Sequence, residues 1–244
     1  MSRFFVPRGS VKGNTISVSG DEAHHIVDVM RLKVSDGVVT FDGLGREYTG
    51  VITKADKRSL VIEVKSVRES ESLSGPRVTV IQAIPKREKI EYFIEKATEL
   101  GVSVIMPVTS ERTIPDWSDE KKASHLERWR KLAREASKQC GRLDVPEISK
   151  IAEFRGLLAD IKNDGIKLIA ALDDRAVPIK TALQGSGTAG VIIAIGPEGD
   201  FTPGEVNAAV DHGFRIVSLG PRVLKSDTAG LFVLSVIGNE YAGQ

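Results

Sequence analysis

Two short loops that open with Gly-Pro constrain what this chain can fold into. Residues 195–200 follow the apolar run 191–195, residues 219–230 follow the apolar run 216–219, and a helix-like pattern comes after each loop. A proline ends the hydrogen-bonded ladder of a strand, and a glycine lets the backbone approach a ligand closely. Loops of this kind, at the carboxyl ends of strands, are where an open α/β sheet binds its ligand. Each loop taken singly also fits an ordinary strand-to-helix turn, so both interpretations stay open.

The composition narrows the class of protein. The chain has 244 residues, 41% of them hydrophobic and 27% charged, which suits one large or two smaller globular domains. Its net charge of +1 carries no whole-chain signature of a nucleic-acid partner, although a basic face can hide within a balanced total. The single cysteine, Cys140, allows no internal disulfide, and its helical context predicts a buried packing residue. With no apolar run of about 18 residues and no charged-then-apolar leader, we expect a cytoplasmic protein.

The N-terminal part reads as a small β-barrel with one helix. Short runs rich in β-branched residues are separated by Gly, Asp, Asn and Lys clusters, at residues 4–6, 15–18, 38–42, 48–53 and 60–67. A helical pattern over residues 21–30 interrupts them. The pair His24 and His25 lies on this helix, but adjacent helical residues point about 100° apart. With no further His or Cys at ligand spacing, we predict solvated or capping histidines and no metal site.

A polar stretch that ends in Gly-Pro, residues 69–76, marks the best domain boundary, and we predict domains at residues 1–72 and 73–244. Beyond the boundary, strands and helices alternate, which indicates an α/β domain. The expected strands are residues 78–84, 102–108, 167–172, 191–195 and 214–219. The expected helices are residues 88–100, a long helix that includes 126–140, residues 203–212 and residues 226–241. Gly101 and Gly141 are expected to end two of them, and Thr202 and Glu205 to form a capping box.

A glycine motif at residues 185–190 matches the G-x-G-x-x-G fingerprint of dinucleotide-binding domains. That fingerprint follows a strand and opens a helix, whereas these glycines precede the strand at residues 191–195. We therefore reject an NAD site.

Basic residues crowd the long helix and the ends of neighbouring strands. They are either a solvated face or an RNA-binding face, and the second reading predicts contacts from Arg31, Lys33, Lys86, Arg87, Arg112, Lys138 and Arg142.

Several segments together resemble one family. They are Leu-Gly-Pro-Arg-Val-Leu at 219–224 with Asp-Thr-Ala at 227–229, Ile-Gly-Pro-Glu-Gly at 195–199, and residues 95–101, 110–112, 128–129 and 139–142. The set is similar to the 16S rRNA (uracil-N3)-methyltransferase family, RsmE type, of the SPOUT class. The resemblance implies a C-terminal α/β methyltransferase domain that threads a trefoil knot, and a small N-terminal PUA-like β-barrel that binds RNA. It also implies methylation of N3 of a uridine in 16S ribosomal RNA of the small subunit.

The resemblance further implies that S-adenosyl-L-methionine lies against the two glycine loops, with S-adenosylhomocysteine as product. Contacts carried over by position are Leu172, Gly196, Pro197, Gly199, Leu219, Gly220, Leu224, Thr228 and Ala229. Because the sulfonium methyl is already activated, the protein must align uracil N3 with it and help N3 lose its proton. Asp227 or Glu198 could take that proton or balance the charge of the sulfonium, and Arg222 or Lys225 could stabilise the negative charge that moves to the uracil oxygens.

Two positions depart from the family pattern. Asp200 stands where the family usually has glycine, and Lys225-Ser-Asp227-Thr228 stands where it usually has Arg-x-Glu-Thr. The departures leave the catalytic assignment open, because Glu198 and Asp227 could equally be carboxylates favoured by helix N-termini.

The sequence leaves two other functions and the oligomeric state open. A non-catalytic RNA-binding protein with a degenerate knot is the main alternative, and a nucleotide-dependent oxidoreductase rests only on the misplaced glycine motif. The final helix is apolar nearly all round, which predicts either full burial in one subunit or a homodimer. The expected partner is 16S rRNA or the assembled small ribosomal subunit, with no membrane association.

Overall fold

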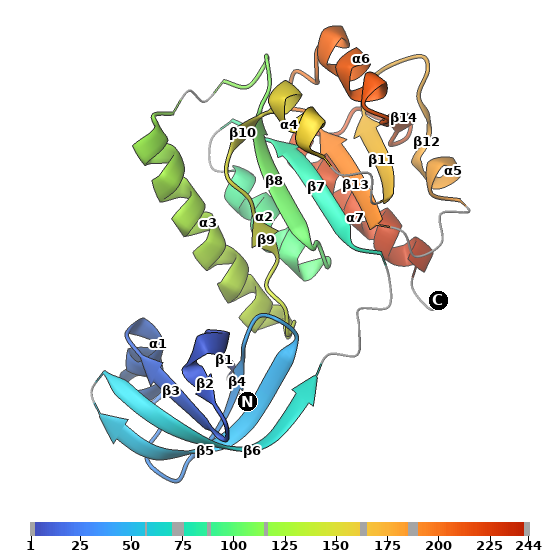
Figure 1. The fold of residues 1–244 in the computed structure, drawn as a ribbon. Helices are drawn as coiled ribbons and strands as arrows, with labels where there is room; N and C mark the ends of the chain where they lie inside the picture. Colours follow the sequence, from blue (N-terminus) through green and yellow to red (C-terminus); the bar gives the residue numbers. More distant parts are fainter. Residues whose placement is uncertain are drawn as a thin grey trace. The chain divides into compact units, whose positions relative to one another are not determined.

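The computed structural model describes residues 3–56, 58–69, 76–86, 89–114, 117–161, 165–184 and 190–241 (Figure 1). The chain divides into two compact units. The first comprises Met1–Ser72 and Ser137–Val145, and the second comprises Leu73–Ala136 and Pro146–Gln244. The predicted boundary at residues 72 and 73 and most of the glycine motif at 185–190 lie outside the described residues.

The first unit is built on a six-stranded sheet in the order β1-β4-β5-β6-β3-β2. The strands are β1 Arg3–Phe5, β2 Val11–Lys12, β3 Thr15–Ser19, β4 Gly37–Phe41, β5 Arg46–Asp56 and β6 Ser59–Glu69. Neighbours are antiparallel except β1 and β4. Burial alternates along β3, where Ile16 and Val18 face the core between exposed residues, as expected for a sheet with one buried face.

The single helix expected at residues 21–30 is two pieces. Helix α1, Asp21–His24, runs into a π-helical turn, η2, His25–Val29, in which the Met30 amide bonds to the His25 carbonyl. A short 3-10 turn, η1, occupies Arg8–Ser10. The two histidines have local partners: His24 Nδ1 lies 2.6 Å from Asp28 Oδ2, and the His25 ring packs edge-on against Phe4.

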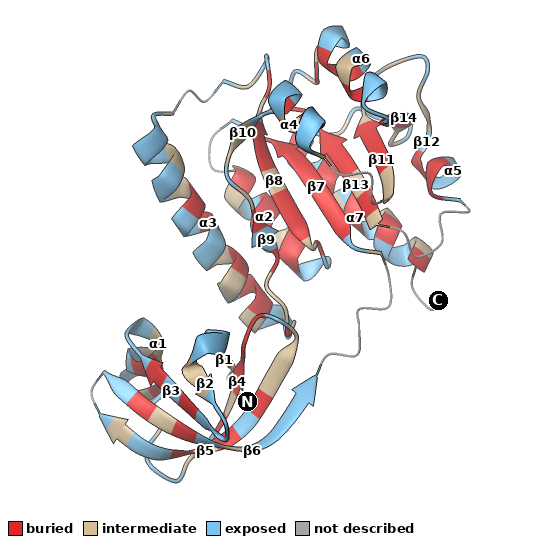
Figure 2. Ribbon diagram, viewed as in Figure 1, coloured by how far each residue is buried: buried red, intermediate tan, exposed pale blue. Residues whose placement is uncertain are grey.

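The second unit contains a parallel sheet in the order β10-β8-β7-β13-β11-β14-β12, with β9 paired to β8. The strands are β7 Val78–Ala83, β8 Val104–Thr109, β9 Glu147–Ile148, β10 Ala152–Glu153, β11 Gly165–Ala170, β12 Val177–Pro178, β13 Gly190–Ile195 and β14 Arg215–Ser218. All six residues of β7 are buried (Figure 2). Such continuous burial is typical of a parallel strand whose two faces are both covered.

Helices cover both faces of this sheet (Figure 1). The helices that come after β7 in the chain are α2 Lys89–Glu99, α3 Asp119–Cys140, α4 Phe154–Asp160, α5 Ile179–Leu183, α6 Pro203–Asp211 and α7 Ser226–Tyr241. On one face, α4 and α6 pack together over Ile81, Val108 and Ile169. On the other face, α7 packs against β7, β13 and α2. The fold class is confirmed as an α/β domain with a parallel sheet preceded by a β-sheet domain, while the knotted path stays a prediction.

The predicted helix ends are confirmed, and one burial prediction is wrong. Thr202 and Glu205 form the capping box, with the Glu205 amide bonding to Thr202 Oγ1 at 3.2 Å and the Thr202 amide to Glu205 Oε2 at 2.8 Å. Gly101 and Gly141 have φ values of +86° and +84°, the left-handed conformation that ends helices. Cys140, predicted to be buried, is exposed because α3 ends at this residue, beyond its buried stripe. In the part of the chain that is described, no helix is long and apolar enough to cross a membrane.

Candidate active site

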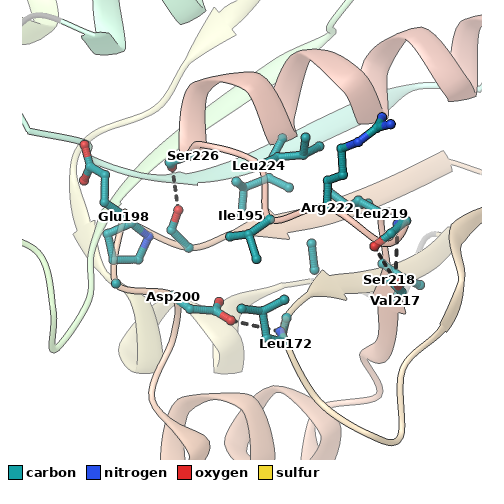
Figure 3. A pocket seen from close by; sticks show the side chains of 18 residues that line it. Leu172, Ile195, Glu198, Asp200, Val217, Ser218, Leu219, Arg222, Leu224 and Ser226 are labelled. Carbon is teal, nitrogen blue, oxygen red and sulfur yellow. Dashed lines mark hydrogen bonds between the residues drawn. The ribbon is translucent and has the colours of Figure 1, made fainter.

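A pocket of about 240 Å³ lies at the carboxyl edge of the parallel sheet (Figure 3). Strands β13, β11 and β14 are parallel neighbours, so their carboxyl ends lie side by side. Three segments wall the pocket: residues 170–172 at the end of β11, residues 195–200 at the end of β13, and a stretch that begins within β14 and continues past its end. The last of these contributes Val217, Ser218, Leu219, Gly220, Arg222, Val223 and Leu224, and the start of α7 adds Ser226 and Ala229.

The first glycine loop is shaped around Gly196. A Cβ at this position would lie 2.9 Å from the Phe201 amide nitrogen and 3.1 Å from Asp200 Oδ1. Both distances are shorter than ordinary contacts, so a side chain here would displace the loop. Asp200 has φ +60°, a left-handed conformation uncommon for residues other than glycine. Its carboxylate accepts hydrogen bonds from the Leu172 amide at 2.9 Å and the Phe201 amide at 2.8 Å.

The second loop leads into α7, whose first residue reaches back to the first loop. Ser226 is buried, and its Oγ donates to the Gly196 carbonyl at 2.5 Å (Figure 3). Gly220 has φ +115°, which favours glycine. The two glycine loops, distant in sequence, are therefore joined at the pocket wall.

Glu198 and Arg222, two of the four predicted catalytic residues, line the pocket. The Glu198 carboxylate is occupied: it accepts a hydrogen bond from the Lys86 amide at 3.1 Å and lies 3.4 Å from Lys89 Nζ. In Figure 3 this carboxylate points away from the side chains of Ile195 and Leu224. The geometry thus fits a residue that holds the first loop against the segment after β7.

Lys225 and Asp227 lie beside the pocket without lining it. Lys225 is exposed, whereas Asp227 is half-buried. Its Oδ1 is buried and has no hydrogen-bond partner among the described residues. A buried carboxylate oxygen without a donor is unusual, because burial of a polar atom is normally offset by a hydrogen bond.

The structure brings together all the predicted cofactor contacts except Thr228, which is exposed on α7 beside Ala229. Pocket residues that sequence reasoning left out are Ala170, Ala171, Ile195, Asp200, Val217, Ser218, Val223 and Ser226. Half of them, Ala170, Ile195, Val217 and Ser218, are the ends of the three strands themselves. The strand order would have found them, because parallel neighbours expose their last residues at one edge.

The predicted RNA contacts fall in both units. Arg31 and Lys33 are exposed just after η2 in the first unit. In that same unit, the side chains of Lys138 and Arg142 are only 9% and 10% exposed and pair with Glu22 at 3.0 Å and Asp144 at 2.5 Å.

In the second unit, Lys86 and Arg112 lie against the first glycine loop, with Arg112 Nη1 donating to the Gly199 carbonyl at 2.5 Å. Arg87 lies outside the described residues. The role of these residues as RNA contacts stays a prediction.

Two models of known protein families match this chain, one over each part of it. The RNA methyltransferase domain matches residues 73–238, and the RNA methyltransferase PUA domain matches residues 18–65. Ribosomal RNA small subunit methyltransferase E of Bacillus subtilis is 31% identical over 97% of this chain and 96% of its own. The Mycobacterium bovis protein of that name is 32% identical over 96% and 90%.

A crystal structure of ribosomal RNA small subunit methyltransferase E from Neisseria gonorrhoeae, bound to S-adenosyl methionine, matches with a TM-score of 0.87. It is 29% identical and covers 98% of each chain. Together with the fold, the two family models define an α/β RNA methyltransferase domain joined to a PUA domain. The chain belongs to the RNA methyltransferase family of ribosomal RNA small subunit methyltransferase E.

Proposed function

We propose that this protein transfers the methyl group of S-adenosyl-L-methionine to N3 of a uridine in 16S ribosomal RNA, leaving S-adenosylhomocysteine. The observation that carries the proposal is the pocket at the sheet edge, where two glycine loops joined by Ser226 come together. Support comes from the Neisseria gonorrhoeae relative, which was crystallised with S-adenosyl methionine and covers 98% of this chain.

The residues of the pocket fit an adenosyl ligand. Leu172, Leu219 and Leu224 provide apolar surface for a purine ring, and Leu172 is 73% exposed. At Gly196 the backbone itself lines the pocket, and the loop is packed so closely there that a Cβ would lie 2.9 Å from the Phe201 amide nitrogen. Ligand pockets commonly combine apolar walls with a few backbone polar groups in this way. When bound, the cofactor supplies a methyl group already activated by its sulfonium.

The protein must hold uracil N3 in line with that methyl group, and it must accept the proton that N3 loses. Of the two carboxylates, Asp227 suits the proton-accepting role better. Glu198 already accepts from the Lys86 amide and faces Lys89, whereas Asp227 Oδ1 has no donor among the described residues. Arg222, exposed on the pocket wall, is placed to stabilise negative charge on the uracil oxygens.

The PUA domain, with its boundary placed at residue 72, presents the RNA. Arg31 and Lys33 are exposed on it and are the basic side chains best suited to phosphate contacts. Lys138 and Arg142 are less suited, because their carboxylate partners would have to be displaced. The substrate is 16S rRNA, free or in the assembled small subunit, which places the protein in the cytoplasm.

The enzyme works as a homodimer in this proposal. Along α7, Val233, Leu234 and Ile237 are buried, while Phe232 on another side remains 39% exposed and Leu231 and Val236 are half-buried. A helix that is apolar on its outer side also needs cover there. Sedimentation should find a dimer for the wild type and a monomer for Phe232→Glu. A Phe232→Glu variant with unchanged mass would contradict this interface.

The dimer proposal includes a site completed across the interface. Gly196→Val, defective in cofactor binding, is co-expressed with a chain lacking Arg31 and Lys33, and the mixed dimer is purified with two tags. Methylation by the mixed dimer, with both parent homodimers inactive, supports a shared site. A mixed dimer that binds cofactor and RNA but stays inactive means that each chain works alone.

The first test of the proposed function is a calorimetric titration. S-adenosylmethionine should produce binding heat with the wild type, and NAD should produce none. Absence of heat from S-adenosylmethionine would contradict the proposal and favour a non-catalytic RNA-binding protein.

A further inference from the structure

A short chain of buried polar groups runs beneath the pocket. Gln82, near the end of β7, is fully buried, and its Nε2 donates to Ser226 Oγ at 2.8 Å and to the Ala83 carbonyl at 3.0 Å. Ser226 Oγ donates in turn to the Gly196 carbonyl at 2.5 Å. The three linked residues come from the end of β7, the start of α7 and the first glycine loop.

The direction of this chain is determined by its last acceptor. The Gly196 carbonyl can only accept, so the single hydroxyl proton of Ser226 is committed to it. Ser226 Oγ must then accept from a donor, which the amide NH₂ of Gln82 supplies. The second N–H of that amide goes to the Ala83 carbonyl. A flipped amide would set its oxygen against two acceptors, so Gln82 acts here as a donor.

Gln82 is an unusual residue for its surroundings. Its Oε1 is buried without a hydrogen-bond partner among the described residues. Gly230 leaves room for this side chain, because a Cβ on Gly230 would lie 3.0 Å from Gln82 Oε1 and 2.5 Å from Phe93 Cε2. A buried amide whose oxygen lacks a hydrogen bond makes the folded state less stable than an apolar residue of the same size would. In return, Gln82 donates two hydrogen bonds, to Ser226 Oγ and to the Ala83 carbonyl.

We propose that Gln82 is a positioning residue for methyl transfer: through Ser226 it holds the Gly196 carbonyl and so sets the separation between the first glycine loop and the start of α7. This inference rests on the proposed function. Ser226 immediately precedes Asp227, and Gly196 lies on the pocket wall, so this separation also places the carboxylate relative to the pocket. Neither Gln82 nor the Ser226 hydroxyl acts on the reacting atoms.

The test uses variants that remove one link at a time. Gln82→Met keeps the volume and removes the donor, Ser226→Ala removes the hydroxyl, and Ser226→Thr keeps it. Thr79→Val, at the other end of the same strand β7, is the matched control for a buried polar change. For each full-length variant, binding of S-adenosylmethionine is measured by calorimetry, and kcat and KM by methylation of small-subunit RNA.

Gln82→Met and Ser226→Ala should each lower kcat/KM for the cofactor about tenfold, the scale of one lost hydrogen bond, with the KM for RNA unchanged. Ser226→Thr should restore what Ser226→Ala loses. If Gln82 acts only through Ser226, the double variant should be no worse than Ser226→Ala alone. Thr79→Val should have kinetic constants like those of the wild type.

Three results would overturn the inference. They are wild-type kinetics for Gln82→Met, losses that add in the double variant, and a loss in Thr79→Val equal to that in Gln82→Met. If Ser226→Ala does not fold, the kinetic constants of Gln82→Met can still be compared with those of Ser226→Thr and Thr79→Val, and a loss confined to Gln82→Met supports the inference. Failure of the proposed function looks different, because the wild type itself would then neither bind the cofactor nor methylate RNA.

Discussion

The Asp200 carboxylate accepts a hydrogen bond from the Leu172 amide at 2.9 Å and so ties the segment after β11 to the loop after β13. The backbone of Asp200 itself is left-handed, with φ +60°. The second carboxylate oxygen accepts the Phe201 amide at 2.8 Å and so braces the turn that surrounds Gly196. A glycine at position 200 would adopt the positive φ angle easily, but it could accept neither of these two hydrogen bonds. Asp200 provides both.

Variants of Asp200 should separate backbone angle from hydrogen bonding. Asn tolerates the left-handed conformation and keeps one acceptor oxygen, Gly keeps only the angle, and Ala keeps neither. We expect affinity for S-adenosylmethionine to fall in the order Asp, Asn, Gly, Ala, with Ala about tenfold or more below the wild type. Calorimetry measures the order, and an Ala variant with wild-type affinity would rule out the bracing role.

Gly196→Ala should abolish cofactor binding even though it adds a single methyl group. The new Cβ would lie 2.9 Å from the Phe201 amide nitrogen, so the loop must move away from its present path. Gly238→Ala is the control: among the described residues, no atom other than those of its chain neighbours and its own helix backbone lies within 4 Å of its Cβ position, and alanine favours the interior of α7. Thermal unfolding and calorimetry should report two folded proteins, only one of which binds. Equal affinities would show that the loop adapts.

Asp227→Asn tests the proton acceptor. Asparagine keeps the shape of the side chain but cannot take a proton, so kcat should fall by about a hundredfold or more while cofactor affinity changes little. Single-turnover methylation separates chemistry from product release. A variant that reacts at the wild-type rate would assign Asp227 to stabilisation of the start of α7.

His125 lies in an aromatic stack. Its ring is stacked on Trp117 at 4.1 Å between centroids and lies 5.6 Å from the buried Trp129. Burial, with the positive charges of Lys121 and Arg128, lowers the pKa of His125 below its usual 6.5, and Glu91 opposes the shift. The folded chain thus prefers the neutral imidazole.

This shift predicts a loss of stability in weak acid. Because the folded-state pKa is lowered, the unfolded chain binds the proton first as the pH falls. The stabilisation should be complete above pH 6.5 and be lost as the pH falls through the lowered pKa. Urea unfolding followed by tryptophan fluorescence suits the test, since both tryptophans of the chain belong to this stack. His125→Gln should unfold with a weaker pH dependence between pH 7 and 5, and an unchanged dependence would contradict the assignment.

Local patterns predicted most of the fold. Periodicity located the strands around both glycine loops, and the Thr202 capping box marked the start of α6 within one residue. The short elements β9, β10, β12, α4 and α5 were missed because two-residue strands and helices of five to seven residues hold too few turns for a period to show.

Long-range partners explain the rest. Ser226 and Gln82 are 144 residues apart, and no local pattern connects a glutamine at the end of a strand with a serine at the start of a helix. The basic residues show the same limit in one case: the charge of Lys138 was plain in the sequence, but its partner Glu22, 116 residues away, was not. The partner of Arg142, Asp144, is only two residues along the chain and could have been read locally. The pocket itself was accessible to sequence reasoning because Gly-Pro loops after strands report sheet geometry directly.

The most direct test of the central claim is nucleoside mass spectrometry of RNA treated with the protein. Small ribosomal subunits, or 16S rRNA extracted from cells that lack the protein, are incubated with S-adenosylmethionine and with wild type or Gly196→Ala, then digested to nucleosides. The account predicts N3-methyluridine with the wild type and none with Gly196→Ala. Methyl groups on another atom or base, or no methylation by a wild type that binds the cofactor, would contradict it.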